Sequence, residues 1–176
     1  MSIHRLNHAV LFVRELARSV AFYTDVLGFT PAMGDTGSPL PGAAFLRAPA
    51  SANDHDLGLF ELGSHATGSV AGRSSVGLYH LAWEVDTLAD LQQLQPALAA
   101  AGALTGASDH GTTKSLYGKD PDGLEFEICW IVPADRLDDQ ALAGRTSIRP
   151  LDLDREISRY GAHTAGGIGI SRVATA

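Results

Sequence analysis

The sequence has a single cysteine, no cluster of basic residues and no long apolar run. Cys129 alone cannot form an intramolecular disulfide, and it lies in the apolar stretch FEICWIV, so we interpret it as a buried core residue. A formal net charge of −7 without any concentration of Lys or Arg argues against nucleic acid as a partner. No segment approaches the roughly 20 apolar residues of a membrane span, and the start MSIHRLNHAV lacks the features of a secretory signal. We therefore expect a cytoplasmic protein that binds neither nucleic acid nor membranes.

Two parts of the chain read alike. The 176 residues are 45% hydrophobic and 19% charged, which is the composition of a compact globular protein. The stretch His8–Val13 is followed by ELARSVAFYTDVLGF, and the stretch His80–Val85 is followed by DTLADLQQLQPALAAAG. Each copy begins with a histidine, continues as a β-rich apolar segment and then takes helical spacing up to a glycine. We interpret the chain as two similar halves.

The pattern of elements predicts an α+β fold made of two βαβββ modules. In the first strand the side chains alternate, so that His8 shares a face with Val10 and Phe12. Helices are expected from Leu16 to Leu27 and from Leu88 to Leu98, with Pro96 kinking or interrupting the second. Further strand-like runs occupy residues 29–33, 43–48, 56–62, 115–118 and 124–132.

These elements give the expected domain organisation. Residues 1–133 form one domain, with module 1 at about 4–63, a linker rich in Gly, Ser and Ala at 63–75, and module 2 at about 77–132. Residues 134–176 form a tail, in which we expect short helices at 134–142 and 152–160 and a flexible end from Gly161.

Two repeat-matched histidines and a carboxylate in an apolar strand indicate a metal site. His8 and His80 each lie early in a half-buried strand. The segment DPDGLEFE is a turn followed by a strand and ends on Glu127, whose charge is costly in an apolar run unless a metal ion or a buried arginine balances it. Two imidazoles and one carboxylate suit a divalent transition-metal ion with positions left open for a substrate.

These residues resemble the vicinal oxygen chelate superfamily, which includes glyoxalase I, bleomycin- and fosfomycin-resistance proteins and extradiol catechol dioxygenases. The resemblance covers residues 4–132 and rests on the start LNHAVLFVRELARSVAFYTDVLGF and the end DPDGLEFE. It implies a vicinal oxygen chelate fold and maps the family's metal ligands onto His8, His80 and Glu127. One departure is Glu15, at a position where an Asp commonly follows the first strand.

Within the superfamily, the stretch from Asp109 to Glu127 resembles the signature of extradiol dioxygenases. It has a His, a short gap, an apolar residue with Tyr, an acid-Pro-x-Gly turn and the ligand Glu, although Ser108, two residues before the His, departs from the residues usual there. The segment NDHDLGLF resembles the strand that carries the family's acid/base histidine, here His55. The resemblance implies that His110 and Tyr117 hydrogen-bond the substrate or oxygen species. It further implies Fe(II), or alternatively Mn(II), as the cofactor, and a small aromatic diol and O2 as the reactants.

Two other functions stay open at this point. Glyoxalase-like isomerisation uses a fourth ligand at the end of the first module, where Glu61 lies on the face that alternation would share with His55, and it would favour Zn(II) or Ni(II). A resistance-type binding protein is the third option, although such proteins tend to lose the metal ligands. Apolar residues nearby suggest an aromatic or apolar substrate: Phe45, Leu57, Leu59, Leu78 and Trp83. The open strand edges of two small sheets predict a homodimer.

Overall fold

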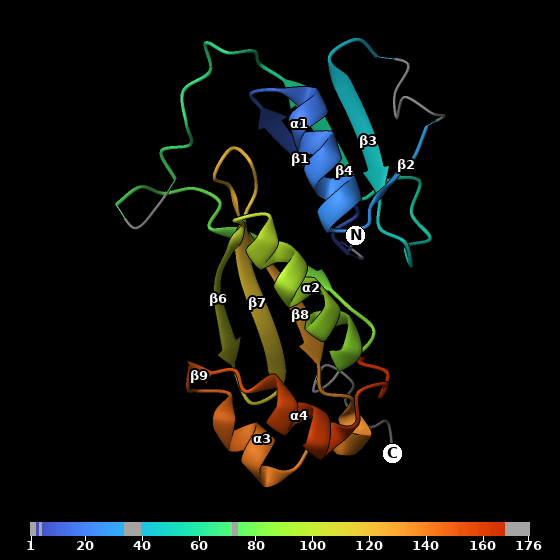
Figure 1. The fold of residues 1–176 in the computed structure, drawn as a ribbon, viewed down its shortest axis with the longest axis vertical. Helices are drawn as coiled ribbons and strands as arrows, with labels where there is room; N and C mark the ends of the chain where they lie inside the picture. Colours follow the sequence, from blue (N-terminus) through green and yellow to red (C-terminus); the bar gives the residue numbers. More distant parts are fainter. Residues whose placement is uncertain (1–2, 4, 34–39, 72–73, 168–176) are drawn as a thin grey trace. The chain divides into compact units, whose positions relative to one another are not determined.

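The structure is a computed structural model, and it describes residues 3, 5–33, 40–71 and 74–167. The chain forms two compact units, one of residues 1–70 with 120–123 and the other of residues 71–119 with 124–176. Each unit contains one mixed β-sheet with a helix packed against it (Figure 1). The predicted α+β fold of two βαβββ modules is confirmed.

The first unit contains a four-stranded sheet in the order β1-β4-β3-β2, with β1 parallel to β4 and the other pairs antiparallel. The expected alternation in the first strand is confirmed, because Leu11 and Val13 are buried while Val10 and Phe12 are exposed. The helix passes into a π-helical turn and ends at Gly28, which has a φ of +76°. The elements are β1 (Ala9–Val13), α1 (Leu16–Ala21), η1 (Phe22–Val26), β2 (Thr30–Pro31), β3 (Ala43–Arg47) and β4 (Leu57–Glu61).

The second unit repeats this strand order and adds one strand, β9 (Arg149–Pro150), giving β5-β8-β7-β6-β9 with β5 parallel to β8. β6 and β9 are strands that the sequence analysis did not predict. Cys129 is buried as expected, and burial, with the charges of Glu127 and Glu84, raises the pKa of its thiol to about 12. The elements are β5 (His80–Glu84), α2 (Leu88–Ala100), β6 (Leu104–Asp109), β7 (Thr113–Lys119) and β8 (Glu125–Ile131).

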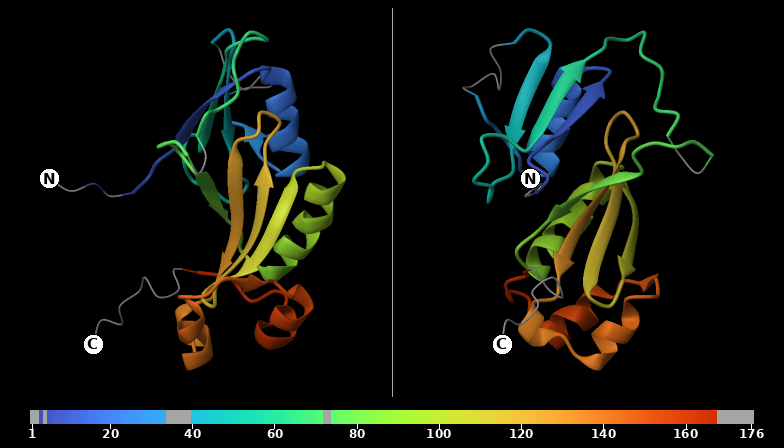
Figure 2. Two further views of the ribbon diagram at one scale, coloured as in Figure 1. Left: turned by 90° about the vertical axis from the view of Figure 1, so that its left-hand side faces the viewer. Right: turned by 180° about the vertical axis from the view of Figure 1, so that it is seen from behind.

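Helix α2 lies along one face of the second sheet (Figure 2). Thr87 and Asp90 form a capping box at its start, in which each side chain accepts a hydrogen bond from the other residue's backbone N–H. The expected interruption at Pro96 is wrong, since the helix continues through this residue to Ala100. Pro96 lies on the exposed side, while Leu91 and Leu98 on the buried side keep the helix on the sheet.

The C-terminal segment gathers at one end of the second sheet (Figure 1). It contains η2 (Ala134–Arg136), α3 (Asp139–Gly144), β9 (Arg149–Pro150) and α4 (Leu153–Tyr160), and β9 pairs with β6. In the expected flexible end, residues 161–167 contact the rest of the second unit: the Trp130 ring nitrogen donates to Thr164 O at 3.2 Å and Gly166 N donates to Asp86 O at 2.6 Å. The rest of that expected flexible end, 168–176, lies outside the described residues. Over the described ranges, no helix has the length and apolar character needed to cross a bilayer.

Candidate functional site

His80 and Glu127 meet on the face of the second sheet that points away from α2. In the parallel pair β5–β8, Ala82 lies opposite Glu127, while Phe126 and Ile128 on either side of Glu127 are buried toward the helix. His80 Nε2 lies 3.1 Å from Glu127 Oε2, and the two side chains are 25% and 12% exposed. Ser115 Oγ on β7 donates a hydrogen bond to the other carboxylate oxygen, Oε1. Glu127 is therefore held with one oxygen aimed at the imidazole.

His110 and Tyr117 extend the same face. Tyr117 lies directly opposite Glu127 in the antiparallel pair β7–β8, so the two side chains share the face. The Tyr117 hydroxyl and His110 Nε2 share a hydrogen bond of 2.8 Å, and the His80 ring centroid lies 6.0 Å from that of Tyr117. Burial and then the charge of Glu127 raise the pKa of Tyr117 to about 12, so the phenol stays protonated and can donate a hydrogen bond. Four of the six predicted site residues are thus close together in this unit.

The other two predicted site residues, His8 and His55, meet in the first unit. Their ring centroids are 4.6 Å apart, and the ring of Phe45 lies 4.9 Å from that of His55. His8 Nδ1 lies 2.8 Å from Asn7 Oδ1, and His55 Nδ1 lies 3.0 Å from Asp54 Oδ2. These partners favour a proton on Nδ1 of each ring, which leaves each Nε2 with a lone pair for a ligand or a proton.

A turn before β4 determines where His55 points. The buried carboxylate of Asp56 accepts hydrogen bonds from Ala48 N at 2.9 Å, Ser51 Oγ at 2.8 Å and Asn53 Nδ2 at 2.7 Å. These bonds fix a compact loop, and His55 precedes the first residue of the regular strand. Strand alternation therefore does not extend to His55, whose ring lies with His8 and Phe45 instead of with Leu57 and Leu59.

Glu61 lies on the opposite face of the first sheet from the His8 side chain. In the parallel pair β1–β4 it is opposite Val13, whose side chain is buried toward α1. Its Oε2 accepts a hydrogen bond of 2.7 Å from Leu16 N, the first residue of α1. The N-cap residue, Glu15, makes no side-chain capping bond. Glu61 on β4 instead accepts the hydrogen bond from a free backbone N–H at the start of the helix. The expected sharing of a face with His55 is wrong.

Replacing Glu61 with glutamine tests this assignment. The amide oxygen can still accept the bond from Leu16 N, so we expect metal affinity and turnover to stay at the wild-type values while the helix start is preserved. Glutamine would remove a carboxylate ligand if Glu61 held the metal. Metal titration of the E61Q protein measures the difference, and a large loss of affinity would show that Glu61 is a ligand.

The apolar residues that were expected to line the site lie on different faces of the two sheets. Phe45 lies on the His8 face, where it contacts His55. Leu57 and Leu59 are fully buried in the core beneath α1, and Trp83 lies opposite Ile128 on the side of the second sheet that faces α2. Leu78 is 55% exposed.

Ser115 is a site residue that sequence reasoning missed, because a serine in a strand carries no signal until its partner across the sheet is known.

The second unit offers a pair of side chains that fit a metal ion. Two ligands that bind one ion at about 2.1 Å and at right angles are themselves about 3 Å apart, which matches the 3.1 Å between His80 Nε2 and Glu127 Oε2. Within each unit, the residues covered by the structure include no group of three or more His, Cys, Asp or Glu side chains placed to share an ion. His8, the third predicted ligand, belongs to the first unit.

Comparisons with known proteins identify relatives of the chain. A family model described as "Glyoxalase/Bleomycin resistance protein/Dioxygenase superfamily" matches residues 5–128. The catechol-2,3-dioxygenase of Bacillus subtilis (strain 168) is 32% identical over 133 residues, which make up 72% of this chain and 42% of that protein. The chain therefore spans less than half the length of this curated relative.

Solved structures show the same fold. A glyoxylase/bleomycin resistance protein/dioxygenase domain from Frankia sp. EAN1pec matches with a TM-score of 0.57 and 27% identity, over 73% of this chain and 92% of that one. A fosfomycin resistance protein from Mesorhizobium loti matches with a TM-score of 0.54 and 20% identity, over 78% of this chain and 100% of that one. A lactoylglutathione lyase from Agrobacterium tumefaciens matches with a TM-score of 0.52 and 20% identity, over 73% and 95%.

Proposed function

Because this chain belongs to the Glyoxalase/Bleomycin resistance protein/Dioxygenase superfamily, we propose that it is an extradiol dioxygenase that opens a catechol-type ring with O2. Proteins of this superfamily generally bind a divalent metal ion and commonly act on small molecules. The observation that carries the proposal is the hydrogen-bonded pair His110–Tyr117 on the same sheet face as the pair His80–Glu127. Ring cleavage uses such donors beside the ion, whereas glyoxalase-type isomerisation requires neither residue. The relationship to a catechol-2,3-dioxygenase supports the same reaction.

The proposed ligands of the ion are His8, His80 and Glu127. His8 Nδ1 is paired with Asn7 and His80 Nε2 faces Glu127, so each ring has a nitrogen available as a ligand. Fe(II), or alternatively Mn(II), would supply open positions for the two catechol oxygens and for O2.

The surrounding residues then have defined proton and hydrogen-bond roles. His55, with Nδ1 held by Asp54, takes a proton from a catechol hydroxyl at Nε2 and later returns it. The Tyr117 hydroxyl, protonated at neutral pH, orients the catecholate oxygen. His110 stabilises the negative charge that develops on oxygen. Both atoms of O2 enter the product, and the carbon–carbon bond next to the diol breaks to give a ring-opened semialdehyde, without any external reductant.

The glyoxalase-like alternative depends on Glu61 as a fourth ligand, with Zn(II) or Ni(II) as the metal. Glu61 instead caps α1 from the opposite face of the sheet, which weighs against this alternative. A resistance-type binding protein is the remaining candidate, and it would bind its ligand without a metal requirement.

We also propose a homodimer. β1 and β5 each lie at one edge of their sheet, with a single strand neighbour. An edge strand presents unpaired backbone N–H and C=O groups to a partner.

Anaerobic reconstitution with Fe(II), followed by catechols and O2, tests the proposed reaction. We expect oxygen uptake and a yellow ring-fission product that depend on Fe(II). The matched comparison is Zn(II)- or Ni(II)-loaded protein with a hemithioacetal, where we expect no turnover. Absence of both oxygen uptake and yellow product across a panel of catechols would contradict the proposal, and turnover of the hemithioacetal would favour the glyoxalase class.

A further inference from the structure

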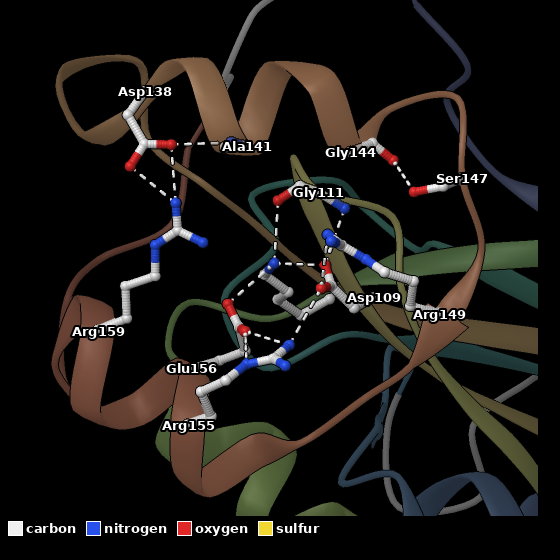
Figure 3. Close-up of polar contacts among 11 residues, drawn as sticks. Asp109, Gly111, Asp138, Ala141, Gly144, Ser147, Arg149, Arg155, Glu156 and Arg159 are labelled. Carbon is white, nitrogen blue, oxygen red and sulfur yellow. Dashed lines mark hydrogen bonds and ion pairs between the residues drawn. The ribbon is translucent and has the colours of Figure 1, made fainter.

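A buried cluster of charges joins the C-terminal segment to the second sheet (Figure 3). Lys114 on β7 is fully buried, and its Nζ lies 2.5 Å from Asp109 Oδ1 on β6 and 3.0 Å from Glu156 Oε2 on α4. The side chains of Asp109 and Glu156 are 2% and 1% exposed. Burial of these three charges is costly unless each is balanced by another. Glu156 on α4 therefore helps to balance the buried charge of Lys114 on β7.

Two arginines complete the cluster on its outer side. Arg149 contacts Asp109 Oδ2 at 3.0 Å, and Arg155 lies 3.4 Å from the same oxygen and 2.9 Å from Glu156 Oε1. Burial alone would raise the pKa of Asp109, but the hydrogen bonds from Lys114 and Gly111 N, together with the positive charges of Lys114 and Arg149, lower it overall. Asp109 is thus held as a carboxylate.

The cluster fixes the tight turn that carries His110. Gly111 N donates to Asp109 Oδ1 at 2.8 Å, and Lys114 Nζ donates to Gly111 O at 3.0 Å. His110 lies between these anchored residues, and its backbone N–H donates to Thr113 O at 2.9 Å. The buried charges of Asp109 and Lys114, which bind α4, therefore also hold this turn in place.

Helix α3 closes the turn from the other side. Gly111 has a φ of +76°, and a Cβ at this position would lie 2.3 Å from Ala141 O and 2.7 Å from Gly144 Cα. Only glycine allows so close an approach of the two backbones. The turn is thus held between the cluster on one side and α3 on the other.

We infer that α3, β9 and α4 form a clamp that positions His110 against the Tyr117 hydroxyl, with Glu156 as its central positioning residue. This inference rests on the proposed function, since it assigns His110 a place in that reaction. The clamp lies in residues 139–160, which are outside the part of the chain that matches the superfamily, residues 5–128. It gives this additional segment a role in the site without any contact of its own with the substrate.

Loss of the clamp has a specific expected effect. Without the charge of Glu156, Lys114 keeps one buried carboxylate in place of two, and the turn samples more conformations. The His110–Tyr117 hydrogen bond is then populated less. Because His110 acts on charge that develops during the reaction, kcat falls by about 10- to 100-fold while KM stays near the wild-type value.

The test compares E156Q with D138N. Asp138 forms an ion pair of 2.7 Å with Arg159 in the same segment, and asparagine can still accept the capping bond from Ala141 N. D138N therefore removes a charge from the segment without touching the turn. In ¹⁵N-histidine-labelled protein, with the His110 signals assigned from an H110A spectrum, we expect E156Q to move the His110 Nε2 resonance toward that of a free imidazole. D138N should leave both this resonance and kcat unchanged.

The NMR measurement separates this inference from the proposed function, because it needs no turnover. If the wild-type protein cleaves no catechol but E156Q still shifts the His110 resonance, the proposed reaction fails and the clamp stands. If the His110 resonance and kcat of E156Q equal those of D138N, the inference of a clamp is wrong. If E156Q does not fold, R149Q removes the half-exposed partner of Asp109. A smaller shift of the His110 resonance in the same direction supports the clamp, and no shift overturns it.

Discussion

Replacing Lys114 with methionine is expected to lower the free energy of unfolding by about 3–5 kcal/mol. Methionine fills much of the volume of the lysine stem but carries no charge. The substitution therefore leaves Asp109 and Glu156 buried without the cation that lies between them. Arg149 and Arg155 are about half exposed and compensate only in part. Urea unfolding with linear extrapolation measures the loss.

The matched control is Lys119→Met on the same strand. Lys119 pairs with Glu125 at 3.5 Å, and both side chains are about half exposed, unlike the fully buried Lys114. An exposed pair of this kind contributes about 0–1 kcal/mol, so the control should unfold close to the wild-type midpoint. Equal stabilities of the Lys114 and Lys119 variants would show that the buried cluster does not hold the C-terminal segment in place.

The second large effect is expected at Glu127. Glu127→Gln removes the charge of a proposed ligand while its amide oxygen can still accept the bond from Ser115 Oγ. Removal of a residue that hydrogen-bonds a metal ligand typically lowers metal affinity by about 10- to 100-fold. Because Glu127 is itself a proposed ligand, we expect divalent metal affinity to fall by more than this and ring cleavage to disappear with it. Metal titration under anaerobic conditions, followed by oxygen uptake with a catechol, measures both effects.

Glu125→Gln is the control for this prediction. Glu125 lies two residues earlier on β8 and on the same face, and its carboxylate pairs with Lys119 in solvent. It carries the same charge at nearly the same place and lies opposite His80 in the β5–β8 pair, but its carboxylate is 3.5 Å from Lys119 Nζ and it is not a proposed ligand. Glu125→Gln should keep full metal affinity. Wild-type affinity in Glu127→Gln would remove Glu127 from the ligand set.

Much of the fold follows from local patterns in the sequence. The alternation around Leu11 and Val13 is a property of one short segment. The similarity of the two segments that begin at His8 and His80 predicted the two-module fold. Strand β6 was missed because LTGASD has no apolar alternation and is held as a strand by its pairing with β7. The helix through Pro96 was misjudged because packing of Leu91 and Leu98 on the sheet outweighs the lost backbone hydrogen bond.

The site is predictable only where its geometry follows strand periodicity. Glu127 and Tyr117 share a face because they are direct neighbours across two regular strands. His55 departs from periodicity because the bonds to Asp56 shape a loop before β4. The buried partners Lys114 and Glu156 gave no signal, because each is an ordinary surface residue by type and the reason for its burial lies in another part of the chain.

We propose that His8, His80 and Glu127 hold one divalent ion. The most direct test is the number of Fe(II) ions bound per chain, measured after anaerobic loading of wild-type and His8→Ala protein. We expect stoichiometric Fe(II) in the wild type and its loss in the variant, while E61Q keeps the wild-type value. Unchanged stoichiometry in His8→Ala would contradict the ligand assignment.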